Sequence, residues 1–266
     1  MRLITKIMFV ASLILGAAPA WAAIMEKEAT YVASGVTLKG YLAMADDATA
    51  NRPGVLVVHE WWGLNDYARQ RAHMLAELGY VALAVDMYGD GKVATHPKDA
   101  KAFAQEALKD FPTAKGRFEA AMKYLSEQAM VDKNRIAAIG YCFGGGVVLN
   151  MARQGVGLKG VASFHGSLDP AQTAVPGKIH AKILVLNGSD DAMSPPDKVK
   201  AFEEEMTQAK ADFKVISYPK ALHGFTNPDA DRVAKEFQLP VAYNADVDHQ
   251  SWQALQTFLK TIFAQQ

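Results

Sequence analysis

Residues 140–144 read Gly-Tyr-Cys-Phe-Gly and contain the only cysteine of the 266-residue chain. The pattern G-x-C-x-G is that of a nucleophile elbow in which cysteine replaces serine. In such a strand-to-helix turn the nucleophile has a strained backbone, and the flanking glycines leave room for neighbouring chain. A helix from about residue 144 to 153 would direct its N-terminus toward Cys142, where its dipole stabilises a thiolate. We expect Cys142 to be a nucleophile; a buried inert cysteine is the alternative.

A cysteine nucleophile needs a base and a group that orients the base. The expected strand at 182–187 is followed by Asp190 and Asp191, and the expected strand at 213–218 is followed by His223. The order cysteine, aspartate, histidine is the α/β-hydrolase order of nucleophile, acid and base. The sequence therefore predicts a catalytic triad of Cys142, one of the two aspartates and His223.

A third loop follows the expected strand at 54–58 and reads His59-Glu60-Trp61-Trp62-Gly63. In this fold, the loop after that strand supplies one backbone amide of the oxyanion hole. The residue after the nucleophile, Phe143, supplies the other.

Short apolar runs alternate with helical patterns along the chain. Most runs are continuously apolar, as in parallel strands that are buried on both faces. We therefore predict an α/β-hydrolase fold, with a mostly parallel, doubly wound sheet and helices on both faces. Strands are expected at 54–59, 80–88, 135–141, 160–166, 181–188 and 212–219, with an antiparallel hairpin at 28–44. Helices are expected at 66–78, 97–110, 112–128, 144–153, 195–210 and 249–265.

The N-terminus has the pattern of a secretory signal peptide. Arg2 and Lys6 precede a short apolar stretch, and Ala20-Trp21-Ala22 places small residues where cleavage requires them. The apolar stretch is about a dozen residues long, shorter than the ~20 of a membrane-spanning helix, which is the alternative. We expect cleavage after about Ala22, a periplasmic or secreted protein, no stable membrane anchor after cleavage, and one domain over residues 23–266.

Charge and histidine spacing exclude several other classes of function. Without its first 22 residues the chain has 28 − 2 = 26 Lys and Arg against 28 Asp and Glu, so a nucleic-acid partner is not expected. The glycines after Cys142 fit no dinucleotide fingerprint, because Leu149 occupies the place of the last glycine. We expect no metal and no cofactor. The sequence shows no exposed amphipathic seam through which copies would associate, so we expect a monomer. The remaining histidines lack metal-ligand spacing: His59, His73, His96, His180 and His249.

The sequence resembles the dienelactone hydrolase (carboxymethylenebutenolidase) family over roughly residues 28–264. A cysteine elbow together with the His-Glu-aromatic loop is characteristic of that family. The segments that carry the resemblance are HEWWGL at 59–64, DMYG at 86–89, GYCFGGG at 140–146, GSDDAMSP at 188–195 and HGF at 223–225.

The resemblance implies a role for individual residues. It implies Asp191 as the triad acid, from the spacing Gly-x-x-Asp after Gly188, with Asp190 as the alternative. It implies that Glu60 lies beside the thiol and helps to govern its protonation, the alternative being an ordinary loop carboxylate. It also implies that the amides of Trp61 and Phe143 form the oxyanion hole.

The sequence departs from the family at two positions that bind the substrate carboxylate. Members that bind a dienelactone carry arginines where this chain has Asp90 and Asn227, so tight binding of a small carboxylate is not expected. Aromatic side chains could line an apolar pocket instead. Residues expected in that pocket are Trp62, Tyr88, Phe225 and, unless it is purely structural, His165.

Three functions therefore stay open. The first is an exported cysteine hydrolase that cleaves a lactone or activated carboxylic ester through a thioester intermediate. The second is a general esterase or thioesterase for neutral hydrophobic acyl groups. The third is a non-catalytic binding or redox-sensing protein in which Cys142 is oxidised reversibly.

Overall fold

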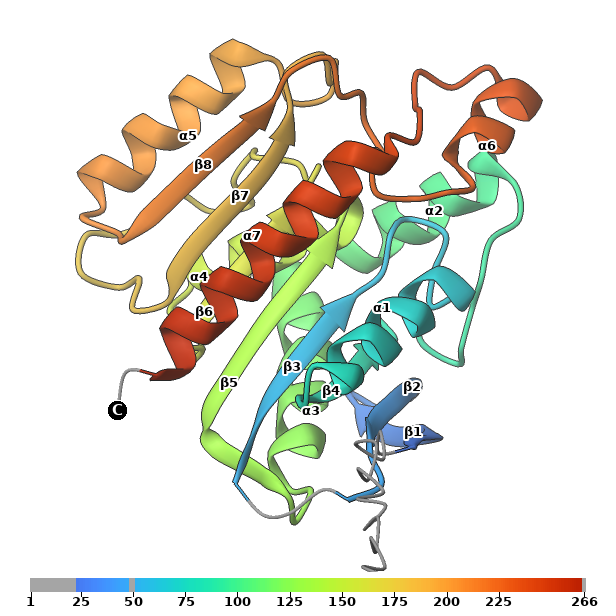
Figure 1. Ribbon diagram of the computed structural model, residues 1–266, viewed down its shortest axis with the longest axis vertical. Coiled ribbons are helices and arrows are strands. Elements are labelled where there is room, and N and C mark those ends of the chain that lie inside the picture. Colours follow the sequence, from blue (N-terminus) through green and yellow to red (C-terminus); the bar gives the residue numbers. More distant parts are fainter. Residues whose placement is uncertain (1–22, 48–50, 265–266) are drawn as a thin grey trace, which may run out of the picture.

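The computed structural model describes residues 23–47 and 51–264 and places them around one eight-stranded sheet with the strand order β1-β2-β4-β3-β5-β6-β7-β8 (Figure 1). The hairpin β1–β2 is antiparallel and joins β4 in antiparallel register, whereas β4, β3, β5, β6, β7 and β8 are parallel to one another. The fold prediction is confirmed. The strands are β1 (Ile24–Ala33), β2 (Val36–Ala45), β3 (Arg52–Val58), β4 (Val81–Val85), β5 (Val131–Tyr141), β6 (Gly160–Phe164), β7 (Lys182–Gly188) and β8 (Phe213–Tyr218).

Helices cover both faces of this sheet. In Figure 1, α1 and α7 lie in front of the strands, and α3 and α4 lie behind them. The described helices are α1 (Asp66–Glu77), α2 (Pro97–Leu108), α3 (Phe111–Ser126), α4 (Phe143–Arg153), α5 (Pro196–Gln208), α6 (Ala230–Phe237) and α7 (Ala245–Ala264).

The side chains of the continuously apolar strands pack into two separate cores, because successive side chains of a strand point to opposite faces of the sheet. In β3, Val55 and Val57 pack with α1 and α7, whereas Leu56 and Val58 pack with α3, α4 and α5. Burial on both faces explains why the central strands show no alternation of polar and apolar residues.

Local sequence signals set several helix starts. The Asn65 side chain accepts a hydrogen bond from the Ala68 N–H at the start of α1, and Asp110 does the same for Thr113 at the start of α3. Prolines in the first turns of α2, α3 and α5 have no N–H to lose there.

The structure adds helix α6, which the sequence analysis left without a prediction, and it extends the hairpin and β5 toward the N-terminus. Residues 1–22, where the signal peptide is expected, lie outside the described residues. Within the described part of the chain, no helix has the length and apolar character that crossing a membrane requires.

Candidate active site

The cysteine lies on a sharp turn between β5 and α4. Cys142 has φ 51° and ψ −112°, a region that costs a non-glycine residue about 1–3 kcal/mol. A Cβ atom on Gly140 would lie 2.1 Å from the Gly144 carbonyl oxygen, and one on Gly144 would lie 2.2 Å from the Val58 carbonyl oxygen. Both positions therefore require glycine, because a side chain there would collide with backbone. The turn leaves Cys142 partly exposed at the carboxyl end of the sheet.

His223 and Asp191 meet beside this cysteine from the loops that follow β8 and β7. The His223 Nδ1 lies 2.8 Å from one Asp191 carboxylate oxygen, and the other oxygen accepts from the Met193 N–H at 2.8 Å. Asp191 is buried, whereas Asp190 is exposed and hydrogen bonds to Ser189. Of the two aspartates that the sequence leaves open, the one in contact with His223 is therefore Asp191.

The second ring nitrogen of His223, Nε2, is available for proton transfer with the Cys142 thiol. Among the described residues, the buried Nε2 has no hydrogen-bond partner that meets ordinary geometry. Burial opposes the imidazolium, but the negative charge of a Cys142 thiolate and the Asp191 carboxylate outweigh it, so the pKa of His223 lies well above its usual value. A histidine held by a buried carboxylate next to a cysteine is an arrangement in which a base can activate a sulfur nucleophile.

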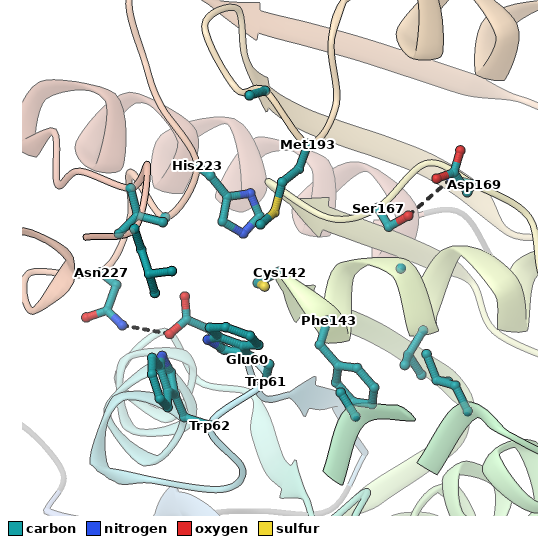
Figure 2. Close-up of a pocket in the computed structure, with 18 of the residues that line it drawn as sticks. Glu60, Trp61, Trp62, Cys142, Phe143, Ser167, Asp169, Met193, His223 and Asn227 are labelled. Atoms are coloured by element: carbon teal, nitrogen blue, oxygen red, sulfur yellow. Dashed lines mark hydrogen bonds between the residues drawn. The ribbon is translucent and has the colours of Figure 1, made fainter. Parts of the chain in front are cut away.

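Glu60 is the second carboxylate of the site. Its side chain is buried, and one of its oxygens accepts from Asn227 Nδ2 at 2.6 Å. Burial raises the pKa of Glu60, opposed by the Asn227 hydrogen bond and the positive charge of His223. Figure 2 shows the Glu60 carboxylate, the His223 ring and the Cys142 sulfur facing the same space.

Two backbone N–H groups, on residues that line the same cavity as Cys142, have no acceptor among the described residues. Phe143 opens α4, and its N–H is one of the unpaired donors of a helix N-terminus. Among the described residues, neither the Trp61 N–H nor the Phe143 N–H donates to a protein group. A pair of unpaired donors beside a nucleophile can stabilise the oxyanion of a tetrahedral intermediate.

The cysteine opens into a cavity of about 670 Å³ with a mostly apolar wall. Among the described residues that line it, Lys198 is the one lysine or arginine, and its Nζ is 2.6 Å from Asp169. Apolar side chains therefore make up most of the described lining, with few charged groups among them. The apolar wall includes Trp61, Trp62, Leu108, Phe111, Phe143, Met193, Leu239 and Val241.

Three residues expected in the pocket lie behind its wall. Of the four predicted pocket side chains, only Trp62 lines the cavity. Tyr88, His165 and Phe225 are at most 4% exposed, which corrects the expectation that they contact substrate. Their rings pack on groups of the site instead: Tyr88 donates to the Trp61 carbonyl oxygen, and His165 packs edge-on against His223.

The structure adds wall and support residues that the sequence analysis did not identify. Asn227, interpreted from the sequence only as a missing arginine, binds Glu60 across 167 positions of the chain. Helix α2 contributes Leu108, and the segment after α6 contributes Leu239 and Val241. These apolar positions carry no motif, and only the path of the chain brings them to the cysteine.

No described group of three or more His, Cys, Asp or Glu side chains has the arrangement of a metal site. Thiol, imidazole, carboxylate and two unpaired amides are the groups that nucleophilic acyl transfer uses.

Known proteins show the same architecture. The model of the dienelactone hydrolase family matches residues 38–263. One similar protein of known crystal structure is P91, a dienelactone hydrolase-like promiscuous phosphotriesterase from metagenomic libraries. Its sequence is 34% identical to this chain, and the match covers 91% of this chain and 99% of P91 with a TM-score of 0.85. A second solved structure, m3DLH, is 32% identical with the same coverage and TM-score.

A curated relative extends the likeness at lower identity. A Saccharolobus solfataricus protein, provisionally named a carboxymethylenebutenolidase, is 26% identical over 277 residues, which is 90% of this chain and 99% of the relative.

Proposed function

The chain belongs to the dienelactone hydrolase family and is a carboxylic ester or lactone hydrolase, and we propose that it works through a Cys142–His223–Asp191 triad and a thioester intermediate. The observation that carries this proposal is the 2.8 Å contact between His223 and Asp191 beside a cysteine on a strained elbow. The arrangement gives one sulfur nucleophile, one base and one buried carboxylate that orients the base.

The first half of the reaction forms the acyl-enzyme. The Cys142 thiolate attacks the carbonyl carbon, and the Trp61 and Phe143 amides hold the oxyanion. The bond to the leaving oxygen then breaks, and that oxygen takes a proton from the His223 imidazolium. A thioester on Cys142 and the free alcohol or enol result; from a lactone, both groups stay on one molecule.

Water completes the cycle. His223 takes a proton from the water as the water oxygen attacks the thioester carbonyl. The C–S bond breaks, the acid leaves, and the thiolate–imidazolium pair is restored. In both halves of the reaction, Asp191 holds the His223 ring in place and stabilises its positive charge.

The cavity favours neutral, hydrophobic esters over small anionic lactones as substrates. The one lysine of the described lining is paired with Asp169, and the rest of that wall is largely apolar. This feature supports the general esterase, the second of the functions that the sequence leaves open. The solved relative named as a promiscuous phosphotriesterase makes a neutral aryl phosphotriester a useful additional substrate to assay.

The proposal includes export. The basic start, short apolar stretch and small residues at 20–22 support a leader cleaved after about Ala22. Fractionation of cells that express the full chain, with the intact mass of the protein, tests this part. A protein retained in the cytoplasm with residues 1–22 still attached would contradict it.

The decisive test of the chemistry is burst kinetics with p-nitrophenyl acetate. We expect one equivalent of acetyl on Cys142 by mass spectrometry, lost after iodoacetamide treatment. The Cys142→Ala variant should fold and lose turnover. Since Cys142 is the only cysteine, every thiol adduct reports on this site.

Substrate choice is tested by comparing neutral aryl esters with an anionic lactone. A strong preference for the anionic lactone would exclude the general esterase. Full activity of Cys142→Ala would refute the triad, and a protein that hydrolyses nothing while its thiol oxidises reversibly would support the redox alternative.

A further inference from the structure

Next to the site, His59 makes contacts that the reaction outlined above does not use. The side chain is 1% exposed and packs against the elbow from the start of the loop that carries Trp61. Its ring is stacked on the Phe143 ring, with centroids 5.7 Å apart and planes 12° apart, and packs edge-on against Tyr88.

The contacts of His59 fix its tautomer. The Met87 N–H can only donate, so the Nε2 that it reaches at 3.3 Å must accept. The proton is therefore on Nδ1, which lies 2.5 Å from the Glu60 carbonyl oxygen and donates to it. Burial lowers the pKa of His59 to about 4, so the ring keeps this neutral form at neutral pH.

The bond to the Glu60 carbonyl oxygen sets the direction of the Trp61 N–H. The peptide that joins Glu60 and Trp61 is planar and trans, so its C=O and N–H point in opposite directions. A carbonyl held toward His59 therefore turns the N–H away from His59. The next peptide is also held, because Tyr88 donates to the Trp61 carbonyl oxygen at 2.9 Å.

His59 also contacts the first two residues of α4, Phe143 and Gly144, and Phe143 carries the second unpaired donor. Its backbone carbonyl oxygen accepts from the Gly144 N–H at 3.1 Å, and its ring packs against Phe143. One residue is thus in contact with the elements that carry both unpaired N–H groups, which belong to loops more than 80 residues apart in the sequence.

We propose that His59 is a positioning residue that aims both backbone donors of the oxyanion hole at the reacting carbonyl. The inference rests on the proposed function, since it assigns His59 to the acyl-transfer step on Cys142. His59 does not touch substrate in this assignment; it acts through the peptide between Glu60 and Trp61 and through the first turn of α4.

Two substitutions separate the two ring nitrogens. In His59→Asn, an amide nitrogen can occupy the place of Nδ1 and still donate to the Glu60 carbonyl oxygen. In His59→Gln, the longer side chain reaches the place of Nε2 and can accept from Met87, but it leaves the Glu60 carbonyl oxygen without its side-chain donor. Removal of one oxyanion donor costs about 10²–10³ in kcat, which sets the scale for a donor that is turned away.

The test compares ester turnover with alkylation of the same sulfur, measured on the full-length chain. Iodoacetamide needs the thiolate but no oxyanion hole. For His59→Gln we expect kcat for p-nitrophenyl acetate to fall about 10²-fold, with KM and the alkylation rate each within about threefold of the wild type. His59→Asn should retain kcat within about tenfold.

Each other outcome has a defined meaning. If kcat is the same in both variants and the wild type, the assignment is overturned. It is also overturned if kcat and the alkylation rate fall together, because that result indicates a general disturbance of the site. If His59→Gln does not fold, Tyr88→Phe tests the same loop: kcat should fall several-fold with alkylation unchanged, and an unchanged kcat would overturn the assignment.

The experiment also separates failure of this inference from failure of the proposed function. If Cys142 is acylated in the wild type but the two His59 variants do not differ in kcat, only the role of His59 is refuted. If Cys142 of the wild type is never acylated, both the role of His59 and the proposed function are refuted.

Discussion

The cysteine end of the cavity and its apolar wall are built on different principles. At the cysteine end, polar atoms meet at hydrogen-bond distances, as between His223 and Asp191, and backbone approaches backbone at Gly144 so closely that no side chain fits. The wall is a set of apolar side chains from separate elements, such as Phe111 of α3 and Val241. Here few polar contacts fix an orientation.

This difference assigns separate tasks to the two regions. Catalysis by charge and hydrogen bonding requires a geometry held within fractions of an ångström, so the cysteine end should tolerate almost no substitution. Selection by an apolar wall scales with the area removed from water and should change gradually. The four predictions that follow test this contrast, from the largest expected effect to the smallest.

The largest effect is expected at Asp191, the carboxylate of the proposed triad. Asp191→Asn leaves one acceptor oxygen where two donors, His223 Nδ1–H and the Met193 N–H, now bind. We expect kcat/KM for p-nitrophenyl acetate to fall by roughly 10²–10⁴, about 3–5 kcal/mol of transition-state stabilisation. The matched control is Asp190→Asn, an exposed neighbour, which should stay within about twofold. The reverse ranking would identify Asp190 as the acid.

The second effect concerns stability and compares two helical glycines. A Cβ on Gly144 meets the Val58 carbonyl oxygen at 2.2 Å, whereas one on Gly116 of α3 meets nothing within 4 Å. Gly144→Ala should lower the free energy of unfolding by about 3 kcal/mol or more, because backbone must shift. Gly116→Ala should raise it by roughly 0.5–1 kcal/mol, since alanine favours a helix interior. Urea unfolding of both variants checks the opposite signs.

The third effect is a pH dependence of stability from His59. Burial lowers its pKa from 6.5 to about 4, so in acid the unfolded chain binds a proton that the folded chain does not. This contribution favours folding above pH 6.5 and is lost as pH falls toward 4. Between pH 7 and pH 5 the loss is about 2 kcal/mol.

Urea unfolding at the two pH values measures the loss, with His59→Asn as the control that cannot titrate at this position. The wild type should lose about 2 kcal/mol more than the control on acidification. Parallel losses in both proteins would show that His59 is not held neutral by burial.

The smallest effect concerns the apolar wall. In a series of p-nitrophenyl esters with lengthening acyl chains, kcat/KM should rise by up to about fourfold per methylene, which corresponds to ~0.8 kcal/mol, until the cavity is filled. Phe111→Asp should flatten the series, because it places a charge in the wall. Val32→Asp, at an exposed position of β1, should leave the series unchanged. If kcat/KM of the wild type decreased with every lengthening of the acyl chain beyond acetate, the result would contradict an apolar acyl site.

Much of the fold follows from local signals in the sequence. Buried parallel strands are recognisable as short apolar runs, and the runs at 160–166 and 181–188 lie within two residues of the ends of β6 and β7. Helix α6 was not predicted, since its eight residues carry two buried apolar side chains and no capping side chain. The start of β5 was missed because its first five residues, Val131–Arg135, include three charged side chains and are not fully buried.

The sequence by itself predicted the sharp turn at Cys142, because the spacing of Gly140, Cys142 and Gly144 is a local property of that turn. It also placed His223 and two aspartates on loops that end at the same edge of the sheet. Tertiary structure decided the contact itself: the family resemblance implied Asp191, with its neighbour Asp190 as the alternative, and the folded chain buries Asp191 against His223 and leaves Asp190 exposed. It likewise decided that Asn227 binds Glu60 and that Tyr88, His165 and Phe225 support the pocket from behind. Such pairings join residues far apart along the chain, and a local pattern carries no information about which distant side chain will pack against it.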